Sequence, residues 1–163
     1  MILKDIHARK NAVYEAEVAS GVATMRPLAT IHDAQVLADF IIKERFWKNY
    51  SIVRKVVLSY VPHWDRDASC GWLPKEPRKA EMELSIGSLC EGTVYHEMAH
   101  LDRRDKDDGH RFAFLRLQFA IMNASASIFA SVLLPRYAIE LRARKAISGN
   151  EPWALPWVNR KGP

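Results

Sequence analysis

The sequence has few cysteines and no long apolar run. Only two cysteines, Cys70 and Cys90, occur in 163 residues, too few for a disulfide framework and too far apart for a zinc knuckle. No stretch approaches the roughly 20 consecutive apolar residues that cross a bilayer, and the opening MILKDIHARKNA reaches a charge after three residues. The sequence therefore predicts a reducing, cytoplasmic setting, without a secretory signal or a membrane span.

Internal repeats and low-complexity tracts are also lacking. Apolar residues make up 48% of the chain and charged residues 26%, which is typical of a folded globular protein. We expect one domain over residues 1–148 and an irregular tail with Pro and Trp over residues 149–163, whose tryptophans pack back on the domain or dock a partner. The net charge of +5 permits a nucleic-acid partner without requiring one.

Helical periodicity predicts five helices. Residues 4–19 are rich in Ala, Glu and Lys, and Thr30 with Asp33 three residues later is typical of a helix start. One face of that second helix is expected to carry Val36, Leu37, Phe40, Ile41 and Trp47. The other three helices are expected over residues 91–103, from His110 onward, and from Pro135 to Ile147.

Two strands are expected between the second and third helices. Residues 51–61 carry apolar side chains on both faces, which is typical of an inner strand. Residues 81–86 alternate between polar and apolar types, which predicts an edge strand with one solvated face. Residues 62–77 are expected to form a loop or an irregular hairpin. The predicted fold class is α+β: a small mixed or antiparallel sheet packed with several helices in a single domain.

The segment from Tyr95 to Leu101 reads YHEMAHL and contains the pattern H-E-x-x-H. On a helix, His96 and His100 differ by about 40° around the axis and about 6 Å along it, so both rings project from one face and can hold one ion. Imidazole nitrogens suit Zn²⁺, and Glu97 can act as general base toward a water on the metal. The alternative is a surface helix with two solvated histidines.

A catalytic zinc site takes three protein ligands, and we expect His110 to be the third. The turn over residues 102–109 is long enough to return the chain to the first two histidines, and Gly109 permits the reversal. Phe114 follows His110 by four residues and is expected to anchor the next helix in the core.

Other residues compete for these roles. The rival oxygen ligands are Asp102, Asp105, Asp107, Asp108 and Glu140. One of the aspartates can instead orient a ligating imidazole. We expect the remaining histidines and cysteines to stay outside the site: His7, His32, His63, Cys70 and Cys90. We also expect a solvated basic face, rather than a nucleic-acid groove, from Arg136, Arg142, Arg144 and Lys145.

The pattern consists of H-E-x-x-H, a spacer of about ten residues, a His, and a Phe four positions after that His. It resembles the core of minigluzincin-type metallopeptidases, and among them the SprT-like proteins. Residues 9–147 are also similar in layout to small metallohydrolases of actinobacteria and their phages, through RKNAVYEAE, a second helix containing Trp, and LPRYAIELRARKA.

This resemblance implies a zincin-like domain over residues 1–148, zinc ligands at His96, His100 and His110, and a base at Glu97. The two families usually carry Gly after the third His, whereas Arg111, Phe112 and Ala113 follow His110 here.

The sequence thus predicts a zinc-dependent hydrolase, most specifically a metallopeptidase acting on a peptide or protein. Glu97 is expected to take a proton from water and pass it to the leaving amine, and residues 81–86 to pair with an extended peptide. The candidate donors to the oxyanion are Tyr95, Tyr137 and Arg111.

Two other hypotheses belong to different classes. The first is a nucleic-acid-associated or partner-binding module whose metal is structural and whose Glu97 is idle, suggested by the basic helix and the Trp-containing tail. The second is a helical interaction protein in which the motif is accidental.

Overall fold

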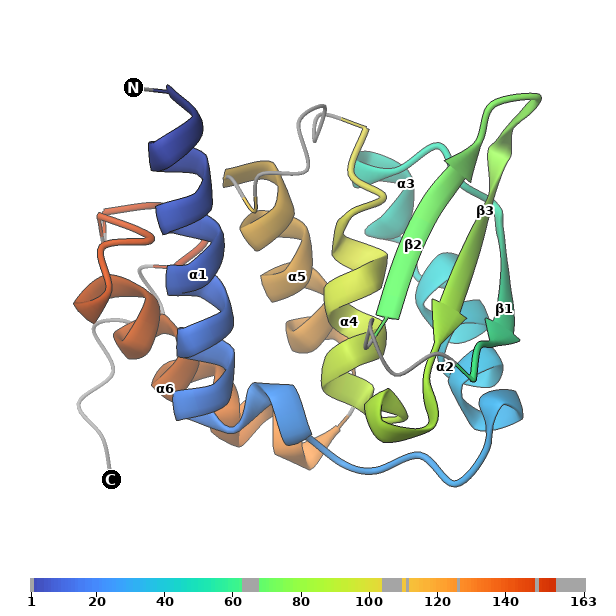
Figure 1. Ribbon diagram of the computed structural model, residues 1–163, viewed down its shortest axis with the longest axis horizontal. Helices are drawn as coiled ribbons and strands as arrows, with labels where there is room; N and C mark the ends of the chain where they lie inside the picture. The colour runs from blue at the N-terminus through green and yellow to red at the C-terminus, as the bar shows by residue number, and fades with distance from the viewer. Residues whose placement is uncertain are drawn as a thin grey trace.

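Helices and a three-stranded sheet make up the fold (Figure 1). The computed structural model describes residues 2–62, 68–103, 110, 112–125, 127–148 and 150–154, with side chains from His7 onward. Within them the order is α1 (Ile2–Ser20), η1 (Val22–Thr24), α2 (Ile31–Lys43), α3 (Trp47–Tyr50), β1 (Lys55–Tyr60), β2 (Ala68–Leu73), β3 (Glu76–Leu84), η2 (Ile86–Ser88), α4 (Glu91–Ala99), α5 (Phe112–Ala124) and α6 (Ile128–Ala143). This mixture confirms the predicted α+β class.

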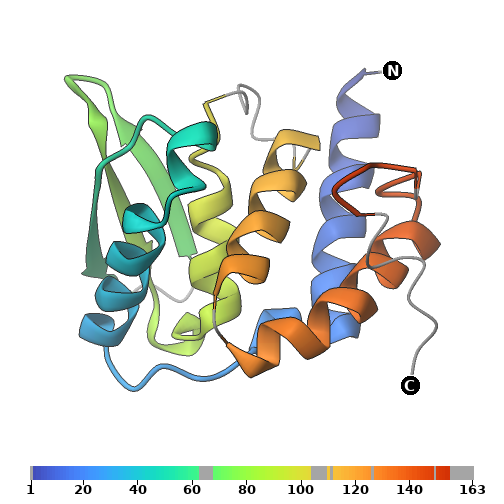
Figure 2. The ribbon, with the colours of Figure 1, turned by 180° about the vertical axis from the view of Figure 1, so that it is seen from behind.

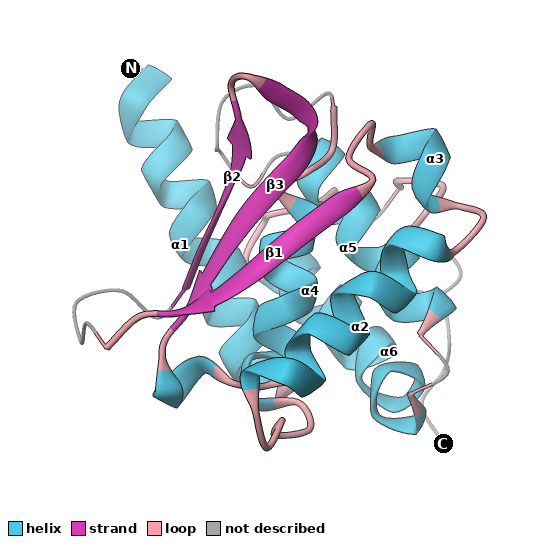
Figure 3. Ribbon diagram, turned by 90° about the vertical axis from the view of Figure 1, so that its right-hand side faces the viewer, coloured by secondary structure: helices cyan, strands magenta, loops and turns pink. Residues whose placement is uncertain are grey.

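The sheet and α1 lie on opposite sides of α4. Figure 1 shows α1 and α6 at one side, α5 and α4 in the middle and the sheet at the other side, and the view from behind keeps this order (Figure 2). Seen from the side of the sheet, the three strands lie in front of α1 and α4, while α2 lies beside them (Figure 3). None of the described helices is long and apolar enough to span a bilayer.

Thr30 and Asp33 form the predicted cap of α2. The Asp33 backbone N–H donates to the Thr30 hydroxyl at 3.2 Å, and the Thr30 backbone N–H donates to the Asp33 carboxylate at 2.9 Å. Each side chain thus satisfies a backbone donor that the first turn of the helix leaves without a partner.

The predicted apolar face of α2 is wrong in part. Its buried residues are Ala34, Ala38, Ile41 and Ile42, whereas Val36 is 54% and Phe40 42% exposed. Two alanines on the inner face let α2 lie close to its neighbours. Trp47 is buried but belongs to α3, because Glu44 adopts an extended backbone and ends α2.

The sheet has the strand order β1-β3-β2, with β1 parallel and β2 antiparallel to β3. The predicted inner strand at residues 51–61 and edge strand at residues 81–86 are therefore interchanged: β3 is central and β1 lies at an edge. The alternation in β3 arises because one face of the sheet is solvated, and it carries no information about edges. Residues 62–77 contain β2, which forms a hairpin with β3.

A side chain from α2 covers the outer edge of β1. The Gln35 amide donates to the Val56 carbonyl at 2.9 Å and accepts from the Leu58 backbone N–H at 3.0 Å, as a neighbouring strand would. The outer edge of β2 pairs with no strand in the part of the chain that the structure describes.

The helices after the sheet differ from their predicted bounds. α4 ends at Ala99 and α5 begins at Phe112, so neither includes residues 100–103 or His110. α6 begins at Ile128 rather than at Pro135, which lies inside it. The proline removes one backbone donor from the helix, and burial of the apolar side chains around it, such as Leu134 and Ala138, offsets this loss.

The tail begins by packing on the domain. The Trp153 ring lies 5.5 Å from the Phe112 ring and 4.9 Å from the Phe119 ring, and Ala154 is buried. Residues 155–163, including Trp157, lie outside the described residues.

Residues 22–28 run beside the start of α4 and hold the end of α1 against it. The Glu91 backbone N–H donates to the Met25 carbonyl at 3.1 Å. A Cβ atom on Gly92 would stand 1.8 Å from the carbonyl oxygen of Val22. Because no real Cβ approaches another atom so closely, this contact between the two segments requires glycine.

Replacing Gly92 by Ala is expected to lower the free energy of unfolding by about 1–3 kcal/mol, because the backbone of residue 22 has to move. Gly87→Ala is the matched control, since no atom lies within 4 Å of its added Cβ, and its effect is expected to stay within about 0.5 kcal/mol. Urea denaturation of both variants measures the difference. Equal stability of the two variants would contradict the close approach.

Candidate metal centre

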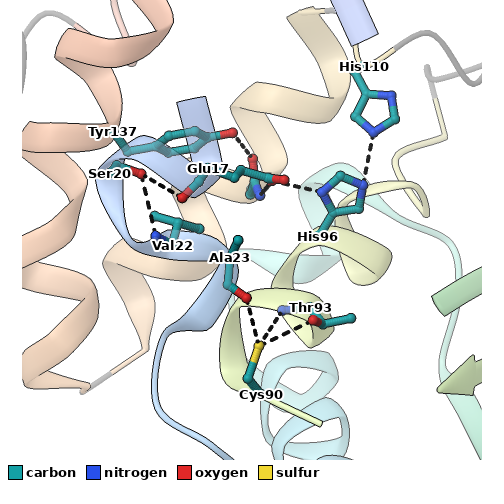
Figure 4. A network of polar contacts seen from close by, with 10 residues as sticks. Glu17, Ser20, Val22, Ala23, Cys90, Thr93, His96, His110 and Tyr137 are labelled. Atoms are coloured by element: carbon teal, nitrogen blue, oxygen red, sulfur yellow. Dashed lines mark hydrogen bonds and ion pairs between the residues drawn. The ribbon is translucent and has the colours of Figure 1, made fainter. Parts of the chain in front are cut away.

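Three imidazole rings meet beside the end of α4. His96 lies in α4, His100 follows it as the cap residue, and His110 precedes α5. One ring nitrogen of each lies within 4.8 Å of the other two, and Nε2 of His110 lies 2.9 Å from Nε2 of His96 (Figure 4). His96 and His110 are buried and His100 is half-buried. The structure thus brings together the three histidines that the sequence predicts as ligands.

The backbone of His110 is left-handed, with φ of 48°. This conformation costs a residue with a side chain about 1–2 kcal/mol, and such residues occur at functional sites where the surroundings hold them. The chain reversal predicted at Gly109 therefore involves His110 itself, while Gly109 lies outside the described residues.

Two aromatic rings enclose the cluster. Phe114 is fully buried, and its ring lies 4.9, 4.7 and 4.4 Å from the rings of His96, His100 and His110. Tyr14 of α1 stacks on His96 at 5.2 Å and lies 5.0 Å from His110. Phe114 is therefore both the core anchor that the sequence predicts and an apolar support for all three imidazoles.

A carboxylate from α1 contacts the other nitrogen of His96. Oε1 of Glu17 lies 2.7 Å from Nδ1 of His96, and both side chains are almost fully buried. The Gln118 amide also donates to this oxygen, at 2.6 Å, and the Tyr137 hydroxyl donates to the Gln118 carbonyl at 2.8 Å. Figure 4 shows Glu17 between Tyr137 and His96. This leaves Nε2 of His96 facing the other two rings.

Burial and charge act on His96 in opposite directions. Burial disfavours the charged ring, but the charge and hydrogen bond of Glu17, with a contribution from Glu97, outweigh it and raise the pKa of His96 above its ordinary value. The carboxylates thus give this part of the site a negative potential that also favours a metal cation.

A cavity of about 710 Å³ opens beside the histidines. The residues that line it include His96 and Glu97 of α4 with the cap residue His100, Lys10, Tyr14 and Glu17 of α1, and Ala68, Ser69 and Cys70 of β2. Glu97 is 8% exposed and borders the same space as the two motif histidines. The cavity gives a small ligand access to His96 and His100, two of the three histidines that could hold a metal ion.

The three histidines fit a zinc ion. Tetrahedral ligands about 2.0–2.1 Å from zinc stand about 3.3 Å from one another, and the ring nitrogens lie at 2.9 Å for one pair and within 4.8 Å for all three. A second-layer carboxylate on a ligating imidazole is typical of zinc sites. In the ranges that the structure describes, no other group of three His, Cys, Asp or Glu side chains has such spacing.

The rival ligands lie elsewhere or outside the described residues. Asp102 is buried beside Arg116, 3.7 Å away, and Glu140 pairs with Arg144. Cys90 caps α4. Cys70, expected outside the site, borders the cavity from β2, where burial and then the charge of Glu97 raise the pKa of its thiol. The exposed His7 and His32 are not in the cluster, and four other residues lie outside the described ranges: His63, Asp105, Asp107 and Asp108.

Two of the candidate oxyanion donors lie away from the cavity. Tyr95 and Tyr137 are fully buried and do not line the cavity, and the Tyr137 hydroxyl donates to Gln118. Burial raises the pKa of Tyr95 to about 12. Arg111 lies outside the described residues.

Sequence reasoning missed Glu17, Tyr14 and Gln118. One signal was available for Glu17: on α1 it follows buried Val13 by four residues and Ala16 by one, so it falls on the apolar face of the helix. A carboxylate contacts an imidazole of the cluster, and it belongs to Glu17 of α1. Three of the aspartates considered for this role, Asp105, Asp107 and Asp108, lie outside the described residues.

No protein-family model matches the chain, and comparisons with curated proteins and with solved structures also found no match.

His110→Ala is expected to remove most zinc binding, because two imidazoles remain where three converge. Zinc added to the wild-type protein is expected to raise its melting temperature, since binding to the folded state stabilises it, and the variant is expected to lose this rise. Differential scanning calorimetry with and without zinc measures both. The exposed His32→Ala is the control and should keep the rise; a zinc-dependent rise in H110A equal to that of the wild type would exclude His110 as a ligand.

Proposed function

We propose that the chain is a zinc-dependent hydrolase, most specifically a metallopeptidase related to the minigluzincin and SprT-like enzymes. The observation that carries the proposal is the position of Glu97. It lies beside the three converging imidazoles and borders the same open cavity as His96 and His100. A purely structural zinc site has four protein ligands and no open position, whereas this arrangement combines three histidines with a carboxylate and a cavity.

Zinc, when bound, acts as a Lewis acid that acidifies water and polarises a carbonyl group. Glu97 accepts a proton from the attacking water as the oxygen adds to the carbonyl carbon. Glu97 then donates this proton to the amide nitrogen as the C–N bond breaks, which leaves a carboxylic acid and an amine. The negative charge that develops on the carbonyl oxygen requires a further donor, and Tyr14 and Lys10 are among the cavity-lining side chains that can donate a hydrogen bond.

The substrate strand pairs with β2 in this proposal. The sheet order excludes the central β3 as a pairing edge, while β2 has a free edge among the described strands and contributes Ala68, Ser69 and Cys70 to the cavity wall. An extended peptide along this edge would satisfy main-chain hydrogen bonds and bring a carbonyl group toward the histidines. Both cysteines are free thiols, in keeping with a reducing compartment, and we propose a cytoplasmic location.

Glu97→Gln is expected to keep the zinc content of the wild type and to lower peptide hydrolysis by at least about 100-fold, because the base is lost while the ligands remain. The measurements are zinc content by plasma emission and cleavage of an unfolded protein such as casein. Glu81→Gln, an exposed carboxylate on β3, is the matched control and should cleave like the wild type. Hydrolysis by E97Q at the wild-type rate would remove Glu97 from the reaction.

A second candidate function is a nucleic-acid-binding module with a structural metal. A separate cavity of about 590 Å³ favours it, since Arg9, Arg142 and Lys145 line this space together with Trp153. Such basic and aromatic side chains suit single-stranded nucleic acid. Salt-dependent binding of a labelled oligonucleotide, without proteolysis under any zinc loading, would favour this function over the first.

A further inference from the structure

The polar groups behind His96 form one chain of hydrogen bonds across four helices. It runs from Tyr137 on α6 to Gln118 on α5, then to Glu17 on α1 and finally to His96 on α4. All four side chains are buried, with exposed fractions of 0%, 0%, 5% and 6%. Buried polar groups require partners, and in this chain each group supplies a partner for the next.

The chemistry of the groups fixes the direction of each bond. A carboxylate oxygen can only accept, so Oε1 of Glu17 accepts from both Nε2 of Gln118 and Nδ1 of His96. The Gln118 carbonyl is then the acceptor for Tyr137. Burial, and next the charge of Glu17, raise the pKa of Tyr137 well above its ordinary value, so its hydroxyl keeps the proton that it donates.

We infer that Glu17, held by Gln118 and Tyr137, is a positioning residue for the metal: it keeps the proton of His96 on Nδ1 and directs the Nε2 lone pair toward His100 and His110. This inference rests on the proposed metal site. The imidazole ring can carry its proton on either nitrogen, and only the form with Nδ1–H leaves Nε2 available to an ion in the cluster. The carboxylate also makes the ring a stronger ligand.

Glu17 and Glu97 both border the cavity, and the contacts of Glu17 tie it to His96. Oε1 of Glu17 lies 2.7 Å from Nδ1 of His96 and also accepts from the fully buried Gln118 amide. In the proposed reaction Glu97 serves the attacking water, whereas Glu17 serves His96.

The test is zinc affinity of the full-length protein, measured by competition with a chromophoric chelator. Glu17→Gln keeps the shape of the side chain but removes its charge, and we expect its affinity for zinc to fall by about 10–100-fold. Glu15→Gln on the same helix is the matched control, since Glu15 is 68% exposed, and its affinity should equal that of the wild type. Zinc affinity of E17Q within twofold of the wild type would overturn the inference.

A spectroscopic measurement separates positioning from a merely structural role. In the zinc-loaded wild type, nitrogen-15 NMR of His96 is expected to show a protonated Nδ1 whose proton exchanges slowly with water, and E17Q is expected to exchange it faster. An unprotonated Nδ1 in the loaded wild type would contradict the inference directly.

If E17Q does not fold, Gln118→Met provides the second variant. It leaves the Glu17–His96 contact but removes the donor that holds Glu17, and a smaller loss of zinc affinity with faster Nδ1–H exchange is expected; wild-type values for both would overturn the inference. A wild-type protein that binds no zinc would instead remove the metal site and the proposed function together. Zinc binding without any hydrolysis would contradict the proposed function alone.

Discussion

The hydrogen bond between Glu17 and His96 is the contact on which the arrangement of the site depends. It joins α1 to α4, two helices that are far apart in the sequence, and both of its side chains are almost fully buried. Burying a carboxylate and an imidazole without partners would cost several kcal/mol. Each therefore requires the other, and the helices that carry them are held in one relative position.

The residues around this contact also hold α1 and α4 in one relative position. Gly92 allows the segment after α1 to touch the backbone of α4, and Glu91 continues that contact through Met25. On the other side, Phe114 packs beneath all three imidazoles. The three imidazoles thus pack on the Phe114 ring, and Glu17 contacts one of them from α1. The cavity, with β2 in its wall, borders His96 and His100.

The fold class and the two motif histidines could be predicted because both depend on local spacing. The four-residue interval between His96 and His100 places them on one helical face wherever the helix lies. Strand order could not be predicted in the same way. Alternation in β3 describes the faces of the sheet, while its central position comes from pairing with β1 on one side and with β2 on the other. Gln35 bonds to the outer edge of β1 and leaves that strand at the edge of the sheet. Glu17 was missed for a similar reason, because its partners are distant in sequence.

The distances along the chain have a consequence for biosynthesis. Glu17 and His96 are 79 residues apart, and Glu17 and Gln118 are 101 residues apart, so the first helix leaves the ribosome long before any of its polar partners exists. Contacts of such long range slow folding. The Glu17 carboxylate therefore has neither of these partners until His96 and Gln118 have been translated, and the histidine cluster with its carboxylate can assemble only after the chain has grown beyond α5.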